Sequence, residues 1–182
     1  DTTELTISYY NQNAEQFIQE TANVDFSAVQ EAFLQYIPTG GLILDLGCGS
    51  GRDSKVFLEK GYRIVAVDGS EKMCRAAREY IGHPVICSLF QNYQPAEKFD
   101  GIWACASLLH LQEKDIISVI RKMSDALKVN GVFYMSFKYG IGAEMRFGRY
   151  YTDFTEDTMQ NMIRGISELS LIKMWFTQDI RT

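Results

Sequence analysis

The first part of the chain repeats apolar residues at helical spacing, and a helix is expected over residues 6–20. A second helix is expected to begin at Ser27, because Gln30 follows at the spacing of a capping box. Pro38 then prevents this helix from continuing. Residues 1–40 are therefore expected to form a helical extension ahead of the remaining chain.

After this extension, short apolar runs alternate with amphipathic segments. Six runs have the length of strands: 42–46, 63–67, 84–87, 99–105, 132–137 and 169–176. Four segments repeat apolar residues as helices do: 52–60, 70–80, 113–128 and 155–166. Buried strands that alternate with helices are typical of a parallel sheet covered on both faces. The pattern predicts one doubly wound α/β domain over residues 1–182, with its core at 41–182.

Composition narrows the class of protein. The 182 residues are 46% hydrophobic and 23% charged, which is ordinary for a soluble globular protein. A net charge of −5 does not favour nucleic acid or an anionic membrane as a partner, and the apolar runs are too short to span a bilayer. The cysteines form no CxxC pair, so no metal site is expected; their apolar settings predict buried, reduced thiols in a cytoplasmic protein: Cys48, Cys74, Cys87 and Cys105.

A glycine cluster with two nearby carboxylates is the main chemical signal. Three glycines between 47 and 51 follow the first run with the spacing G-x-G-x-G, which taken alone is more often a turn. Asp45 precedes them, where a carboxylate repels phosphate and suits an ammonium group. Asp68 ends the second run, where it is placed to accept hydrogen bonds from two ribose hydroxyls. An amine, a ribose and no phosphate describe S-adenosylmethionine.

At these positions the sequence resembles the class I S-adenosylmethionine-dependent methyltransferases, in particular small bacterial ones of the tellurite-resistance-like and type 11 kinds. The resemblance is carried by LDLGCGSG (44–51), VAVDGS (65–70), FDGIWACASLLHL (99–111) and KVNGVFYMSFKYG (128–140). It implies a Rossmann-like methyltransferase sheet in the strand order 3-2-1-4-5, with later strands antiparallel. Residues 169–176 would supply the sixth strand, and the family's last strand is expected to be missing because only residues 177–182 follow.

The resemblance also implies which residues contact the cofactor. Gly47 and Gly49 would face its methionine part, Asp68 the ribose, and Met73 the adenine. The family's aspartate at the adenine amine is absent from CSLFQN (87–92), so the backbone or Gln91 would replace it. The full expected set is Tyr10, Asp45, Gly47, Cys48, Gly49, Arg52, Asp68, Gly69, Met73, Leu89, Phe90 and Ala104.

Several of these residues have ordinary structural alternatives. Met73 and Phe90 are equally well explained as core residues. Arg52 has neighbouring acids with which to form an ion pair, and Tyr10 is equally suited to anchor one face of the first helix.

Methyl transfer from a sulfonium is an in-line displacement that needs alignment and exclusion of water more than a catalytic group. His110, after the fourth strand, is the one plausible general base, with a capping or core role as the alternative. Arg146, Arg149 and Tyr150 lie in an insert at 138–151 and are candidates for binding an anionic substrate; a salt-bridged loop is the alternative.

Motifs that are absent point to a small-molecule acceptor. The fourth strand is not followed by the Asn/Asp-Pro-Pro-aromatic motif of DNA amino-methylating enzymes, nor is there a Pro-Cys nucleophile or an acidic cluster for magnesium. Two other functions stay open: a catalytically silent S-adenosylmethionine-binding sensor or partner subunit, and a nicotinamide oxidoreductase. The glycine spacing and Asp45 argue against the oxidoreductase.

Overall fold

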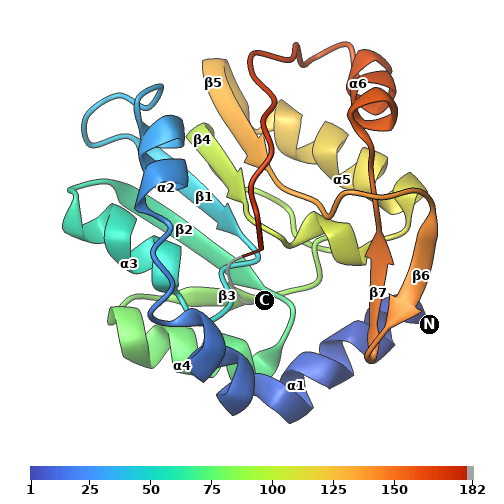
Figure 1. Ribbon diagram of the computed structural model, residues 1–182. Coiled ribbons are helices and arrows are strands. Elements are labelled where there is room, and N and C mark those ends of the chain that lie inside the picture. The colour runs from blue at the N-terminus through green and yellow to red at the C-terminus, as the bar shows by residue number, and fades with distance from the viewer. Residues whose placement is uncertain (180–182) are drawn as a thin grey trace.

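A computed structural model describes residues 1–179, and a five-stranded parallel sheet forms its centre (Figure 1). The strands are β1 (Leu42–Leu46), β2 (Arg63–Asp68), β3 (Val85–Cys87), β4 (Phe99–Ala104) and β5 (Leu127–Met135). Their order is β3-β2-β1-β4-β5, and each neighbouring pair runs parallel. The predicted order and direction of these five strands are therefore confirmed.

Helices cover both faces of the sheet. On one face lie α2 (Ser27–Leu34), α3 (Arg52–Glu59) and α4 (Glu71–Ile81), and on the other α5 (Glu113–Asp125) and α6 (Glu156–Arg164). Successive side chains of a strand point to opposite faces. In β1, Ile43 therefore packs with α2 and α3, whereas Leu44 and Leu46 pack with α5. The doubly wound α/β fold is confirmed.

A helix and a hairpin lie at the carboxyl ends of the strands. The helix is α1 (Thr2–Thr21), which is kinked at Asn13. The hairpin pairs β6 (Ala143–Arg146) with β7 (Arg149–Thr152) antiparallel, in a small sheet of its own. Figure 1 shows α1 crossing below the main sheet from this hairpin to α4. Bonds at both ends of the crossing hold it: Tyr150 N–H donates to Thr6 Oγ1 and Ser70 Oγ donates to Asn11 Oδ1.

The prediction of a sixth strand at residues 169–176 is wrong. Residues 169–176 form no strand, because their backbone does not pair with the edge strand β5. Side chains hold this segment instead: the ring of Trp175 packs against Tyr134 at 5.9 Å and that of Phe176 against Tyr139 at 5.8 Å. Among residues 1–179, the antiparallel pairing that follows β5 is that of the β6–β7 hairpin, which begins within the insert expected to be a loop.

Smaller expectations also fail for local reasons. The helix expected over 113–128 ends at Asp125, because the chain enters β5 at Leu127; within β5, Asn130 adopts φ +66° beside a register shift. The capping box is not formed, because Ser27 donates to Asp25 and the buried Gln30 turns inward. Cys87 is exposed, because it ends the edge strand β3.

Candidate functional site

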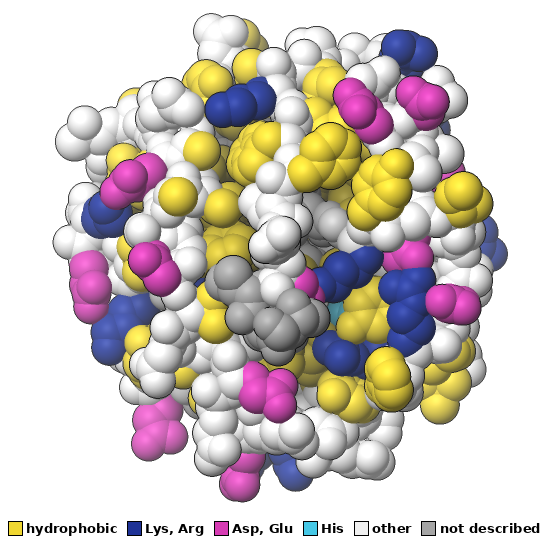
Figure 2. Space-filling view, in the orientation of Figure 1, with side chains coloured by type: hydrophobic (Ala, Val, Ile, Leu, Met, Phe, Trp, Pro, Cys, Tyr) yellow, Lys and Arg dark blue, Asp and Glu magenta, His cyan; other side chains and the backbone are white. Residues whose placement is uncertain are grey.

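One continuous cavity of about 1150 Å³ borders the glycine loop, α1 and the hairpin, and extends as a groove along β5. Single small-molecule sites have about 300–1000 Å³, so this space is large enough for two ligands. Twelve of the predicted site residues line it: Tyr10, Gly47, Cys48, Gly49, Arg52, Asp68, Gly69, Met73, Leu89, Phe90, His110 and Arg149. Four do not: Asp45, Ala104, Arg146 and Tyr150. Figure 2 shows Lys and Arg side chains around a hollow on this face.

The loop after β1 folds back against β2 and so presents its backbone to the cavity. The N–H groups of Gly47 and Cys48 both donate to the carbonyl of Val67, at 2.8 and 3.0 Å. Gly47 has φ +90°, and a Cβ atom there would lie 2.3 Å from the Cβ of Ser107. Only glycine therefore fits at this turn without displacing the segment that follows β4.

Asp68 joins this loop to the start of α4. One carboxylate oxygen accepts from Gly49 N–H and the other from Ser70 N–H, both at 2.9 Å. Burial raises the pKa of Asp68, while these backbone donors act in the opposite direction. Each carboxylate oxygen can accept a further hydrogen bond, so the cavity side of Asp68 is able to bind two more donors.

The part of the cavity bordered by α4 and by the segment after β3 is apolar, apart from the amide of Gln91. Met73, Leu89 and Phe90 line it, and Met73 is fully buried. Gln91 lies beside them and donates through Nε2 to Thr3 Oγ1 at 3.3 Å. Its Oε1 is buried and accepts no hydrogen bond from the described residues. A ligand with an amine at this end would satisfy it.

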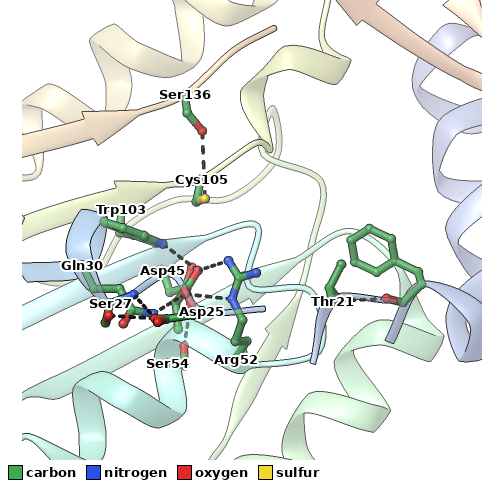
Figure 3. A network of polar contacts seen from close by, with 12 residues as sticks. Thr21, Asp25, Ser27, Gln30, Asp45, Arg52, Ser54, Trp103, Cys105 and Ser136 are labelled. Carbon is green, nitrogen blue, oxygen red and sulfur yellow. Dashed lines mark hydrogen bonds and ion pairs between the residues drawn. The ribbon is translucent and has the colours of Figure 1, made fainter. Parts of the chain in front are cut away.

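A buried network of hydrogen bonds lies next to the glycine loop, between α2, α3 and β4 (Figure 3). Asp53 accepts from Gln30 Nε2 at 2.7 Å and from Trp103 Nε1 at 3.0 Å. Arg52 also pairs with Asp53, at 3.1 Å, which is the structural alternative considered for it. Sequence reasoning did not include Gln30 in the site; the only signal was an amide on an apolar helix face.

Asp45 lies beside this network and not in the cavity wall (Figure 3). It shares the face of β1 that packs under α3, and its carboxyl accepts from Ser54 Oγ at 2.6 Å. Burial first, and the charge of Asp53 second, raise the pKa of Asp45 to about 8. At neutral pH the group is mostly protonated, so Asp45 is not placed to meet a ligand ammonium as a carboxylate.

Asp45→Asn is expected to flatten the dependence of stability on pH. Between pH 3.8, the ordinary pKa, and about pH 8, the folded protein keeps a proton on Asp45 that the unfolded chain loses. Stability therefore falls as pH rises through that window, and the asparagine variant lacks this contribution. Urea unfolding of both proteins at several pH values measures it. Equal slopes in the two proteins would show that Asp45 titrates normally.

At the other side of the cavity, Tyr10, His110 and Arg149 form a chain of hydrogen bonds. His110 Nδ1 lies 2.8 Å from the carbonyl oxygen of Tyr150, which can only accept, so Nδ1 carries the proton. Nε2 then accepts from Tyr10 Oη at 2.8 Å, and Tyr10 Oη accepts from Arg149 Nη1 at 3.3 Å. No local sequence pattern links these residues.

Burial keeps both aromatic members of this chain neutral. It lowers the pKa of His110 to about 4 and raises the pKa of Tyr10 to about 12. Both ring nitrogens of His110 are also engaged. His110 is therefore a weak base here, and its contacts are those of a residue that positions Tyr10.

The hairpin separates the three predicted substrate residues. Arg146 forms ion pairs with Glu144, at 2.8 Å, and with Asp153. Tyr150 contributes backbone bonds to Thr6 and His110. Only Arg149 reaches the cavity wall. The alternative of a salt-bridged loop therefore describes Arg146, and the anionic-substrate hypothesis rests on Arg149.

The described residues offer neither a metal site nor a membrane-spanning helix. Within residues 1–179, no group of three or more His, Cys, Asp or Glu side chains is arranged to hold a metal ion. Over the same residues, no helix combines the length and the hydropathy needed to cross a bilayer.

Comparison with known proteins identifies relatives in sequence. Residues 43–131 match the family model described as a methyltransferase domain. The chain is 31% identical over 150 residues to "Putative methyltransferase YqeM" of Bacillus subtilis (strain 168), covering 75% of this chain and 59% of that protein. It is 29% identical over 124 residues to an uncharacterized methyltransferase of Geobacillus sp. (strain WCH70), covering 65% and 57%. The chain thus spans less than two thirds of both relatives.

Solved structures share its fold. The 1,6-didemethyltoxoflavin-N1-methyltransferase of Burkholderia thailandensis, with bound S-adenosylhomocysteine, has a TM-score of 0.69 at 21% identity, covering 88% of this chain and 73% of that one. The magnesium protoporphyrin IX methyltransferase of Synechocystis PCC 6803 has a TM-score of 0.68 at 15% identity, covering 91% and 88%. Over residues 43–131 the chain thus matches a methyltransferase domain, and its fold is the one that these methyltransferase structures share.

Proposed function

We propose that this chain binds S-adenosylmethionine and transfers its methyl group to a small-molecule acceptor. The observation that carries the proposal is the carboxylate of Asp68. It borders the cavity with its oxygens already oriented by Gly49 N–H and Ser70 N–H, and it keeps acceptor capacity for two hydroxyls. A ribose presents such a pair of hydroxyls.

The remaining walls fit the other parts of this cofactor. Gly47 and Gly49 line the cavity beside Asp68, where the methionine part is proposed to lie against the backbone of the loop. Met73, Leu89 and Phe90 provide apolar surfaces for adenine. The unpartnered Oε1 of Gln91 is an acceptor for the adenine amine, in place of the aspartate found in many members of the family. The binding residues are thus proposed to come from the glycine loop, α4 and the segment after β3.

The sulfonium of bound S-adenosylmethionine supplies an electrophilic methyl group. The protein's own contribution is alignment and exclusion of water, since α1 and β7 close one side of the cavity. We assign no general base, because His110 has a pKa of about 4 and both of its ring nitrogens are bonded. The acceptor is therefore proposed to arrive already able to attack.

The proposed acceptor class and the proposed cellular setting each have one supporting observation. The solved relatives named above are a toxoflavin-precursor and a protoporphyrin methyltransferase, and both names describe small-molecule acceptors. The cysteines of the described chain are all free thiols, which supports a reducing, cytoplasmic setting for the reaction.

The test has two stages. Calorimetry with S-adenosylhomocysteine should show binding of one molecule per chain, and a chain that does not bind it lacks the proposed cofactor site. Methyl-labelled S-adenosylmethionine incubated with a small-metabolite extract should then give a labelled product. Cofactor binding with no labelled product from extracts of several growth conditions would instead support the silent sensor.

A further inference from the structure

Arg149 is a cation in the cavity wall without an acidic partner among residues 1–179. Its basic neighbours differ in this respect. Arg146 is paired with Glu144 and Asp153, and Lys138 is paired with Asp179. Of these three basic residues, Arg149 is therefore the one whose anionic partner would have to come from a ligand.

Three tyrosine rings hold the guanidinium in place. Its Cζ atom lies 4.5 Å from the ring centre of Tyr9, 5.7 Å from that of Tyr10 and 5.4 Å from that of Tyr151. Contacts of this kind hold a planar cation by its faces and do not use the N–H groups at its edge. Nη1 donates to Tyr10, but Nε is buried and has no acceptor in the described chain. Buried donors are normally hydrogen-bonded, so Nε of Arg149 lacks an acceptor that a ligand would supply.

The surroundings do not neutralise the guanidinium. Tyr10 donates its proton to His110 and is neutral, since burial raises its pKa to about 12. His110 is neutral as well, with its pKa lowered to about 4. The contact between α1 and the hairpin thus keeps a single net positive charge between apolar rings.

We propose that the methyl acceptor is a small carboxylic acid whose carboxylate binds Arg149. Guanidinium and carboxylate groups match in a two-point arrangement, which would give Nε an acceptor. One unpaired cation suits a monoanion better than a phosphate dianion, because Arg146 and Lys138 are already neutralised. The tyrosine rings provide surface for the apolar body of the acid. This inference rests on the proposed function.

The methionine carboxylate of the cofactor is the competing anion. It is distinguished by comparing S-adenosylhomocysteine with 5′-methylthioadenosine, which lacks that carboxylate. If Arg149 binds the acceptor, Arg149→Gln should leave the affinity for both nucleosides unchanged. If Arg149 binds the cofactor instead, the substitution should weaken only S-adenosylhomocysteine.

The experiment measures binding of benzoate, phenylacetate and 4-hydroxybenzoate to protein saturated with S-adenosylhomocysteine, each compared with its primary amide. We expect the acids to bind at least about tenfold more tightly than the amides. Arg149→Gln should weaken the acids by roughly tenfold to a hundredfold, and Arg149→Lys by less, because it keeps the charge and loses the two-point geometry. Arg75→Gln, at an exposed arginine of α4 outside the cavity, is the matched control and should change nothing.

Each other result is decisive. The inference is overturned if the amides bind as well as the acids, if Arg149→Gln leaves acid binding unchanged, or if no acid binds to the saturated protein. Should Arg149→Gln unfold, as judged by its thermal transition, Arg149→Lys carries the same comparison. A wild-type chain that does not bind S-adenosylhomocysteine would refute the proposed function itself, and is thus a separate outcome.

Discussion

Asp68→Ala is expected to reduce the affinity for S-adenosylhomocysteine below what calorimetry can measure. The substitution removes a charged acceptor that is proposed to bind two ribose hydroxyls, and each such bond contributes about 1.5–3 kcal/mol. It also leaves Gly49 N–H and Ser70 N–H without their acceptor, so the glycine loop loses a contact with α4. Binding and loop geometry are therefore lost together.

Asp68→Asn is the matched control. It keeps the shape of the side chain and one oxygen acceptor, whereas the amide nitrogen that replaces the other oxygen can only donate. We expect an intermediate affinity. Thermal unfolding of both variants shows whether the fold is kept. A folded alanine variant with wild-type affinity would remove Asp68 from the cofactor site.

Gly47→Ala is expected to have the largest effect on stability of the changes considered. The left-handed conformation at φ +90° costs an alanine about 1–2 kcal/mol. Its Cβ would also lie 2.3 Å from the Cβ of Ser107, and such overpacking costs a further 1–3 kcal/mol, roughly. The loop must shift to relieve the contact, so the affinity for S-adenosylhomocysteine should fall as well. Urea unfolding and calorimetry measure the two effects.

Gly61→Ala separates the two contributions. Gly61 has the same φ of +90°, but a Cβ there would meet no atom within 4 Å. It should therefore lose only the conformational part, and its ligand affinity should be unchanged because it lies outside the cavity. If both alanine variants lose the same free energy of unfolding, then crowding against Ser107 contributes nothing.

Local patterns were sufficient to predict the five strands of the main sheet and the position of Asp68 at the end of β2, whereas the strand order came from the resemblance to a known family. Apolar runs and glycines act over a few residues, and a parallel sheet brings the ends of its strands together. The alternation of side chains along β1 could also be predicted from the sequence: Asp45 shares a face of the strand with Ile43, which packs under α3. Its burial under α3 could therefore have been predicted from the alternation itself.

Other features depend on contacts that no local pattern describes. Tyr10 meets His110 across a hundred residues of chain, and Gln30 meets Asp53 across 23. The pairing of Arg146 with Asp153 exists only once the hairpin has its register. A turn at Phe147 and Gly148, both with positive φ, produces that register. An aromatic residue in this conformation is uncommon, so the sequence favoured a loop there.

The kink in α1 has a consequence for how often the reaction can repeat. The segment before Asn13 carries Thr6 and Tyr10, which line the cavity and bond to the hairpin and to His110. In the proposed reaction, spent cofactor would leave and fresh cofactor enter past this half-helix, whose hydrogen bonds to the hairpin and to His110 contribute about 0.5–1.5 kcal/mol each. We expect the half-helix to open about the kink at Asn13, and the rate of that opening would then set an upper limit on the turnover rate.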